Sequence, residues 1–249
     1  MIYIAGTFID SSSIAEKYPS ESIERKALNI MLSSSNIYAY NMLSELEFEL
    51  NLRKSIVSAA MNLHRSRFSF RLFRETKCNE KYWERTEEGG FLLKDGVKPS
   101  EAIKDIFVNS SLYGTECATA MVIVFYGAIV NVFPEEVFDR VFSYIYLMDW
   151  MYLDRRLGIE YIREPEDYLP GDCRYFKNPD VDPLTPHWQG ENVIDLGDGL
   201  YYGHGMGIGR DQYFIDTLNK YRISGSETSA YLLRSVTRLN FKRLAMYVL

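Results

Sequence analysis

A cysteine that precedes a long uncharged stretch is the first residue of this sequence with clear chemical potential. Cys117 follows Gly114 and Thr115, and no charged residue occurs from 118 to 133. Pro134 then interrupts the stretch, so we expect a largely buried helix that starts beside Cys117, with Thr115 as its N-cap. The unpaired N–H groups and positive dipole end of a helix start favour a thiolate. The sequence therefore offers Cys117 as a nucleophile, the alternative being a small residue packed in the core.

A second group of polar residues surrounds a predicted hairpin. Two apolar runs, 188–196 and 200–205, flank the sequence Gly-Asp-Gly, which is a strong hairpin signal. If the turn is centred on Asp198, the antiparallel register sets Asn192 opposite His204. Polar side chains are therefore expected at the open end of the hairpin.

Glu191 precedes Asn192 and lies opposite Gly205 in the same register. Taken singly, His204 is explained as a hydrogen-bonded histidine at a strand end and Glu191 as a solvated loop acid. Together with Cys117 they permit a papain-like thiol site, in which a base on a strand faces a thiolate on a helix. These residues alone leave open which of the two is the base.

Composition and charge exclude several classes of protein. The 249 residues include 28 Lys and Arg against 34 Asp and Glu, and the net charge of −6 argues against a general nucleic-acid binder. The uncharged run after Cys117 is shorter than the ~20 residues that span a bilayer, and no basic residue precedes Lys17, so neither a membrane span nor a secretory signal is expected. A reducing intracellular setting is the default expectation.

The thiols and imidazoles show no spacing typical of metal ligands, so we expect no metal and no cofactor. The residues concerned are Cys78, Cys117, Cys173, His64, His187 and His204.

Periodicity predicts helices and strands without a repeat or a domain boundary. Helices are expected from Ser20 or Ser22 to Leu32, over 43–63, over 99–107 and from Pro134 onward. Strands are expected over 1–8 and 144–147, with a hairpin formed by 81–86 and 91–93. The basic and aromatic run 64–71 is expected to be a loop or helix edge whose aromatic residues line something. The stretch 165–186, rich in Pro, Gly and Asp, is expected to be an ordered excursion over the surface.

Seven segments carry a resemblance to a known family. They are 45–52, 115–120 (TECATA), 171–173 (GDC), 175–179 (YFKNP), 190–194 (GENVI), 204–205 (HG) and 229–233 (SAYLL). These segments resemble the spore-coat transglutaminases of endospore-forming bacteria, nearly end to end. The family consists of calcium-independent protein-glutamine γ-glutamyltransferases with a papain-like core similar to that of NlpC/P60 hydrolases. The resemblance implies an α+β fold in one domain over 1–249, with the nucleophile at a helix N-terminus packed on an antiparallel sheet.

The resemblance also implies roles for individual residues. Cys117 is the implied nucleophile, Glu191 its principal partner, and Glu116 a second, partly interchangeable glutamate. An ordinary carboxylate, with a pKa of about 4.3, is a weak base for a thiol, so Glu191 is expected to be desolvated. His204 lies in a matching segment.

The family buries its cysteine in an apolar tunnel, and the resemblance implies Trp188, Phe70 and Asn192 as substrate-binding residues beside it. The implied reaction links glutamine and lysine side chains of spore coat proteins through a cysteine thioester. Neither nucleic acid nor membrane is an expected partner, and the implied location is the spore coat, assembled from the mother-cell cytoplasm. Two alternatives are a cysteine amidase or peptidase of NlpC/P60 type, and a non-catalytic coat component in which Cys117 is only packed.

Overall fold

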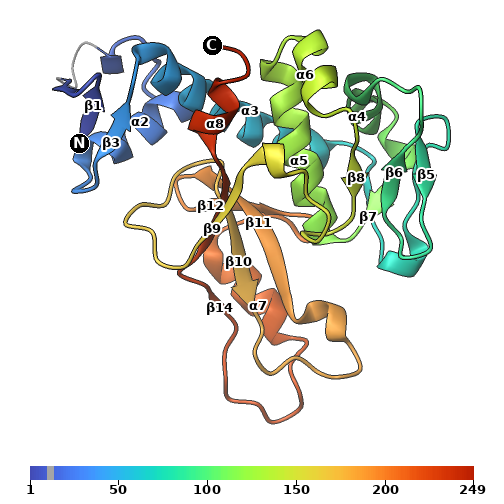
Figure 1. The fold of residues 1–249 in the computed structure, drawn as a ribbon. Coiled ribbons are helices and arrows are strands. Elements are labelled where there is room, and N and C mark those ends of the chain that lie inside the picture. The colour runs from blue at the N-terminus through green and yellow to red at the C-terminus, as the bar shows by residue number, and fades with distance from the viewer. Residues whose placement is uncertain (10–13) are drawn as a thin grey trace.

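The computed structural model describes residues 1–9 and 14–249, and they form the expected mixed α+β fold. In Figure 1, α2, α3, α5 and α6 lie in the upper part of the molecule, and the largest sheet extends below them. No helix in the described ranges is both long and apolar enough to cross a bilayer. The helices are α2 (Ile23–Ser33), α3 (Leu43–Arg65), α4 (Pro99–Val108), α5 (Cys117–Val132), α6 (Glu135–Val141), α7 (Asp211–Asn219) and α8 (Phe241–Ala245), with 3-10 turns η1 (Phe73–Glu75), η2 (Ser110–Leu112), η3 (Arg155–Leu157) and η4 (Pro186–Trp188).

The largest sheet has seven strands in the order β13-β12-β11-β10-β15-β9, with β14 paired to β10, and all of these pairs are antiparallel. Its strands are β9 (Ile159–Ile162), β10 (Cys173–Lys177), β11 (Gly190–Gly197), β12 (Leu200–Gly203), β13 (Gly207–Gly209), β14 (Tyr231–Leu232) and β15 (Val236–Leu239). The smaller sheets are made of β1 (Ile2–Ile4), β2 (Thr7–Phe8) and β3 (Tyr38–Tyr40); of β4 (Ser69–Phe70) and β7 (Gly114–Thr115); and of β5 (Trp83–Arg85), β6 (Phe91–Leu93) and β8 (Tyr146–Leu147).

The hairpin of β11 and β12 has the register expected from the sequence. Ile194 pairs with Tyr202, which is the register of a turn centred on Asp198. The backbone of Asp198 is left-handed, with φ 54°. If the same register continues two residues beyond the pair of Ile194 and Tyr202, Asn192 lies opposite His204.

Most of the expected helices are present, with small differences at their ends. Ser22 caps α2, where its Oγ accepts a hydrogen bond from the N–H of Arg25 at 3.2 Å. The predicted strand over 1–8 is instead a hairpin of β1 and β2, because Ala5 and Gly6 have left-handed backbones (φ 49° and 79°) and turn the chain. The predicted hairpin of β5 and β6 is confirmed.

The prediction that 165–186 runs over the surface is wrong for the middle of this stretch. β10 lies there, between β11 and β15 in the sheet, and its residues Cys173 and Phe176 are only 2% and 0% exposed. The residues that suggested a surface excursion flank this five-residue strand on both sides. So short a strand carries little periodicity of its own, and the turn-forming residues around it dominated the pattern.

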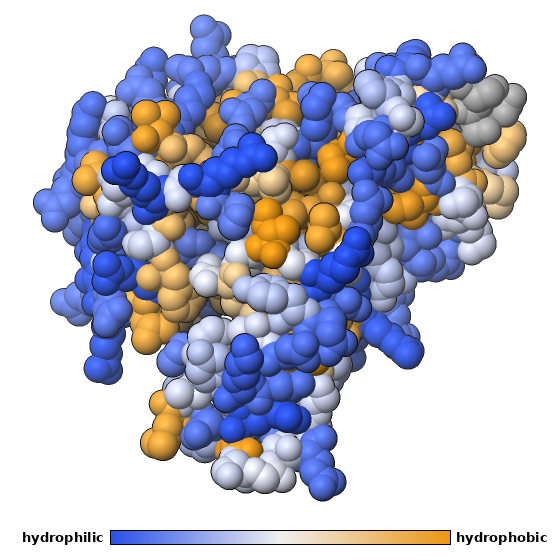
Figure 2. All heavy atoms as spheres, turned by 180° about the vertical axis from the view of Figure 1, so that it is seen from behind, coloured by the Kyte–Doolittle hydropathy of each residue, from blue (hydrophilic) through white to orange (hydrophobic). Residues whose placement is uncertain are grey.

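Helix α5 forms the centre of the hydrophobic core. Every residue from Ala118 to Val130 is buried, and the helix packs against α3, α4 and β11. A helix that is apolar on all sides has to be enclosed by other elements, which fixes its position. The surface seen in Figure 2 is by contrast mostly hydrophilic, with apolar residues gathered near the middle of that face. The core thus holds the start of α5, where Cys117 lies, in a defined place.

A buried network of charges joins α3 to the large sheet. Arg53, which is 1% exposed, donates from Nε to Glu49 at 2.9 Å and from Nη1 to Asp172 at 3.1 Å. Arg238 of β15 donates to the other oxygen of Asp172. Removal of one charge from such a network leaves another buried without compensation, which is strongly destabilising. The network therefore ties α3 to the chain immediately before β10.

We expect Arg53→Met to lower the free energy of unfolding by about 3–5 kcal/mol, because Glu49 and Asp172 lose their shared partner. Lys17→Met is the matched control, since Lys17 pairs with Glu47 at 2.9 Å but both side chains are well exposed, and its cost is expected to stay below about 1 kcal/mol. Urea denaturation followed by circular dichroism measures both. Similar small losses in the two variants would contradict a structural role for the network.

Candidate active site

Glu116, and not Thr115, is the N-cap of α5. The Glu116 carboxylate accepts hydrogen bonds from the N–H groups of Ala118, at 2.5 Å, and Thr119, at 2.9 Å. Thr115 is the last residue of β7, which pairs with β4. The predicted Thr115 cap is wrong because strand pairing extends through this residue, and the carboxylate after it is an equally suitable cap. Cys117 is the first helical residue.

The surroundings of Cys117 oppose ionisation of its thiol. Burial raises the pKa of the Cys117 thiol well above its ordinary value, and the nearby Glu191 and Glu116 raise it further. The backbone and side-chain N–H groups of Asn192 act in the opposite direction. Burial and the two carboxyl groups thus outweigh these donors, and the Glu116 carboxylate also occupies the N–H groups of Ala118 and Thr119 that were expected to stabilise the sulfur. The effect of the helix start itself on the thiol stays a prediction.

Glu191, near the start of β11, is the desolvated carboxylate that the sequence analysis required. Its residue is 5% exposed, and burial raises the pKa of its carboxyl group well above the ordinary range, while a hydrogen bond with Cys117 lowers it. Gly203 of the neighbouring strand leaves room for it, since a Cβ there would lie 2.7 Å from Glu191 Oε1. The thiol and the carboxyl group thus form one buried acidic pair.

Asn192 lies beside the same sulfur. Its Nδ2 is 3.6 Å from Cys117 Sγ, and its strand position is opposite Tyr175 of β10. Successive side chains of a strand point to opposite faces, so Glu191 and Asn192 leave β11 in different directions.

His204 lies just beyond β12 and is enclosed by aromatic rings. Its ring centroid is 4.9 Å from that of Phe68 and 6.0 Å from that of Phe70, and its Nδ1 is 3.2 Å from the hydroxyl of Tyr202. Burial lowers the pKa of His204 to about 4, so the ring is neutral near pH 7. Within the described residues, no hydrogen bond joins His204 to Cys117. Its contacts support Phe70 rather than the thiol.

Cys117 opens into a cavity of about 600 Å³ that combines aromatic and polar side chains. The lining residues are Phe70, Leu72, Phe73, Arg74, Glu75, Glu116, Cys117, Ala118, Asp149, Trp150, Tyr175, Pro186, His187, Gln189, Gly190 and Asn192. The expectation that aromatic residues of 64–71 line something is confirmed by Phe70. Trp188 is not among the residues that line this cavity, because its indole stacks on Tyr221 with ring centroids 3.9 Å apart.

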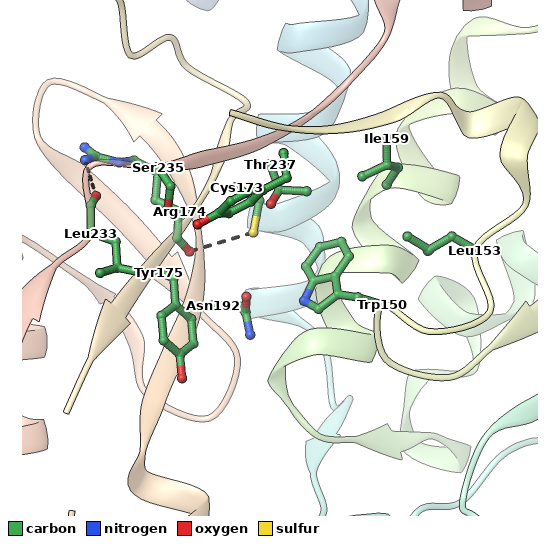
Figure 3. Close-up of a pocket in the computed structure, with 11 residues that line it drawn as sticks. Trp150, Leu153, Ile159, Cys173, Arg174, Tyr175, Asn192, Leu233, Ser235 and Thr237 are labelled. Atoms are coloured by element: carbon green, nitrogen blue, oxygen red, sulfur yellow. Dashed lines mark hydrogen bonds between the residues drawn. The ribbon is translucent and has the colours of Figure 1, made fainter. Parts of the chain in front are cut away.

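A second, mainly apolar cavity of about 540 Å³ shares Trp150, Tyr175 and Asn192 with the first. Figure 3 shows Asn192 between Tyr175 and Trp150, with Leu153 and Ile159 on the far side of the indole. Asn192 therefore stands where the two cavities adjoin.

Sequence analysis did not identify Trp150 or Tyr175 as lining residues. Tyr175 was detectable in principle, because recognition of β10 would have paired it with Asn192. Trp150 lies in the connection between β8 and η3, where no periodic pattern indicates the direction of a side chain.

The arrangement suits covalent chemistry by a thiol with a carboxyl group as proton acceptor. The described residues contain no group of three or more His, Cys, Asp or Glu side chains placed to hold a metal ion. Residue types and geometry thus agree on thiol chemistry at the junction of two cavities.

Known proteins similar to this chain are protein-glutamine gamma-glutamyltransferases. Residues 1–248 match the family described as protein-glutamine gamma-glutamyltransferase. A protein of that name from Bacillus mycoides (strain KBAB4) is 42% identical over 247 residues, which cover 99% of this chain and 89% of the relative. The protein of the same name from Bacillus cereus (strain B4264) is 41% identical with the same coverage. The solved structure of the transglutaminase from Geobacillus stearothermophilus (without C-terminal extension) is similar with a TM-score of 0.79 and 50% identity, and covers 83% of this chain and 98% of that one.

Glu191→Gln is expected to shift the alkylation of Cys117 to lower pH. The Glu191 carboxyl group raises the pKa of the thiol, so its removal increases the thiolate fraction at a given pH, with a shift of about one pH unit or more. The rate of iodoacetamide labelling, followed from about pH 6 to pH 10 by mass spectrometry of the Cys117 peptide, measures the apparent pKa.

Glu75→Gln is the matched control, because Glu75 lines the same cavity but is not among the groups that raise the thiol pKa. An unchanged or higher apparent pKa in Glu191→Gln would contradict the described electrostatics.

Proposed function

This chain belongs to the protein-glutamine γ-glutamyltransferase family and is a transglutaminase, and we propose that Cys117 performs the transfer through a covalent thioester. The observation that carries this proposal is that the buried carboxyl group of Glu191 lies close enough to the thiol of Cys117, which lines a cavity, for each group to alter the pKa of the other. A thiol at the start of a buried helix and a base on a facing strand are the parts that such chemistry requires.

The reaction has two attacks on the same carbon. Sγ of Cys117 attacks the carboxamide carbon of a glutamine side chain, the C–N bond breaks, and ammonia leaves with the proton that the thiol gave up. A lysine amine then attacks the thioester, the S–C bond breaks, and the isopeptide bond forms while the sulfur regains a proton. Glu191 passes the proton from the thiol to the leaving ammonia in the first half of the reaction and from the attacking amine to the sulfur in the second, and its desolvation raises its basicity toward that of the thiol.

Glu116 acts mainly as the N-cap of α5. Both of its carboxylate oxygens accept backbone hydrogen bonds, from Ala118 and Thr119, so it is less available than Glu191 to take a proton. We propose that it replaces Glu191 only in part.

We propose that donor and acceptor approach the sulfur through the two adjoining cavities, of which the first contains Cys117. Both include Asn192 and Trp150 in their walls, and Asn192 contacts Sγ. The apolar side chains of the second cavity, such as Leu153 and Ile159, favour an uncharged amine over an ammonium ion and limit access of water to the thioester. We propose that Phe70 and Asn192 line the substrate path. Trp188 stacks on Tyr221, and we propose that it instead holds the turn η4, which forms part of the cavity wall, in place.

We propose that the natural substrates are spore coat proteins that present glutamine and lysine side chains, and that the enzyme acts in the spore coat without calcium. The resemblance to spore-coat transglutaminases supports this location. We also propose that residues 1–249 form one domain with a papain-like core of NlpC/P60 type, which is supported by the packing of α5 on the antiparallel strand β11.

A cysteine amidase or peptidase on the same core is the alternative. It would use water where a transglutaminase uses an amine, so the ratio of amine incorporation to hydrolysis distinguishes the two. Tight enclosure of the sulfur by Trp150, Tyr175 and Asn192 favours the amine reaction.

Cys117→Ala is expected to lower amine incorporation by about a thousandfold or more, because the nucleophile is lost. The assay follows transfer of a fluorescent alkyl amine to casein in the presence of EDTA. Cys78→Ala is the control, since its thiol lines neither cavity, and Cys173→Ala is expected to be milder than Cys117→Ala. Activity retained in a folded Cys117→Ala protein would refute the thioester mechanism.

Glu191→Gln is expected to lower kcat/KM more than Glu116→Gln, and the double variant more than either, because the buried Glu191 carboxyl group interacts with the thiol, whereas the Glu116 carboxylate is bound to backbone N–H groups. The acid limb of the pH profile should move when Glu191 is replaced. His204→Ala is expected to have a smaller effect than Glu191→Gln, because His204 is neutral and, within the described residues, forms no hydrogen bond with the thiol. Near-normal rates in both glutamate variants, together with an inactive His204→Ala, would instead indicate a cysteine–histidine pair.

A further inference from the structure

The reaction proposed for Cys117 creates negative charge that has to be stabilised close to the sulfur. Charge first forms on Sγ as the thiol loses its proton, and then on the carbonyl oxygen of the substrate as the S–C bond forms. Thiol enzymes commonly use the N–H groups of a helix start for this purpose. In this chain three of those groups are occupied, because the N–H groups of Ala118 and Thr119 bind the Glu116 carboxylate and that of Ala120 binds the Glu116 carbonyl oxygen. Of the first turn, only the N–H of Cys117 itself is left to act beside a donor from another element.

Among the described residues, no positively charged side chain is a main cause that lowers the pKa of the thiol. His204 is neutral because burial lowers its pKa to about 4, and Arg74 lines the cavity without being among the groups that lower the pKa of the thiol. The two carboxyl groups beside Cys117 act against ionisation. Stabilisation of negative charge must therefore come from neutral hydrogen-bond donors.

We propose that Asn192 is a catalytic residue, whose side-chain N–H group stabilises the Cys117 thiolate and then the oxyanion of each tetrahedral intermediate. Its Nδ2 lies 3.6 Å from Sγ. Its place in the walls of both cavities puts it beside a carbonyl group whichever side the substrate enters from. This inference rests on the thioester mechanism proposed above.

The position of Asn192 in β11 holds the donor in place. The strand pairs with β10 at Tyr175, and Asn192 itself is half-buried. A donor fixed by a sheet needs no rearrangement as charge develops, which is the property that makes such groups effective. The backbone N–H of Asn192 also favours charge on the sulfur, so a variant side chain removes one of two donors.

Each half-reaction uses the donor in the same way. When Sγ attacks the carboxamide, the electron pair of the C=O bond moves to oxygen, Asn192 donates to that oxygen, and collapse of the intermediate expels ammonia. When the amine attacks the thioester, the same oxygen again receives an electron pair and collapse expels the sulfur. Loss of the donor is therefore expected to slow both acylation and amine transfer.

Asn192→Asp and Asn192→Ala test this role, because the first keeps the shape without the donor and the second removes the donor without adding charge. We expect each to lower kcat for amine transfer to casein by about 100-fold or more, with KM changed much less. We also expect the alkylation profile of Cys117 to move to higher pH, most strongly in Asn192→Asp. Asn62→Asp is the matched control, since Asn62 is exposed on α3 and the same substitution there should leave rate and profile unchanged.

A kcat within about threefold of wild type in Asn192→Ala, with an unchanged alkylation profile, would overturn the inference. A lower melting temperature with an unchanged alkylation profile would also overturn it, because a purely structural residue gives that result. Cys117→Ala, assayed alongside, separates this failure from failure of the mechanism itself. An inactive Cys117→Ala with an active Asn192→Ala rejects only the role of Asn192, whereas an active Cys117→Ala rejects both.

Discussion

The acidic pair of Cys117 and Glu191 depends on being kept away from water, and the rest of the structure serves this requirement. Burial raises the pKa of both groups, so one proton is retained by the pair and is available for transfer. The buried helix α5 fixes the sulfur, and the antiparallel strands of the large sheet fix the carboxyl group. Neither element could shift without disturbing packed core residues, so the pair is held by tertiary structure and not by local sequence.

Some of the fold was predictable because its signals are local. The Gly-Asp-Gly turn is a local hairpin signal, and the pairing of Ile194 with Tyr202 agreed with expectation because an irregularity between Asp195 and Gly197 shifts the register set at the turn, where Gly197 pairs with Leu200. β10 was not predictable in the same way, since its burial depends on β15, about sixty residues later in the sequence. The prediction of the α5 N-cap was wrong for a related reason. Thr115 is a good cap by residue type, but its pairing in β7 with the distant β4 leaves that role to Glu116.

The candidate site was likewise predictable in part. Residue types and hairpin register brought Glu191, Asn192 and His204 to one end of β11 and β12, yet they could not tell that His204 turns toward Phe68 and Phe70. The direction of the shift in the pKa of the thiol was also out of reach, because it depends on burial and on the carboxyl groups of Glu191 and Glu116 beside the sulfur. Electrostatics at a thiol is determined by a few neighbours at short range, and those neighbours come from separate parts of the chain.

The walls of the cavities come from less constrained parts of the chain than the reacting groups do. Trp150 lies in a connection between elements, and Pro186 and His187 belong to the short turn η4, whereas Cys117 and Glu191 belong to a packed helix and a paired strand. Changes in the connections can therefore accumulate without disturbing the acidic pair. In evolutionary terms, the choice of crosslinked proteins is free to drift while the chemistry stays fixed, and the same separation gives a protein engineer positions at which the range of accepted amines can be altered.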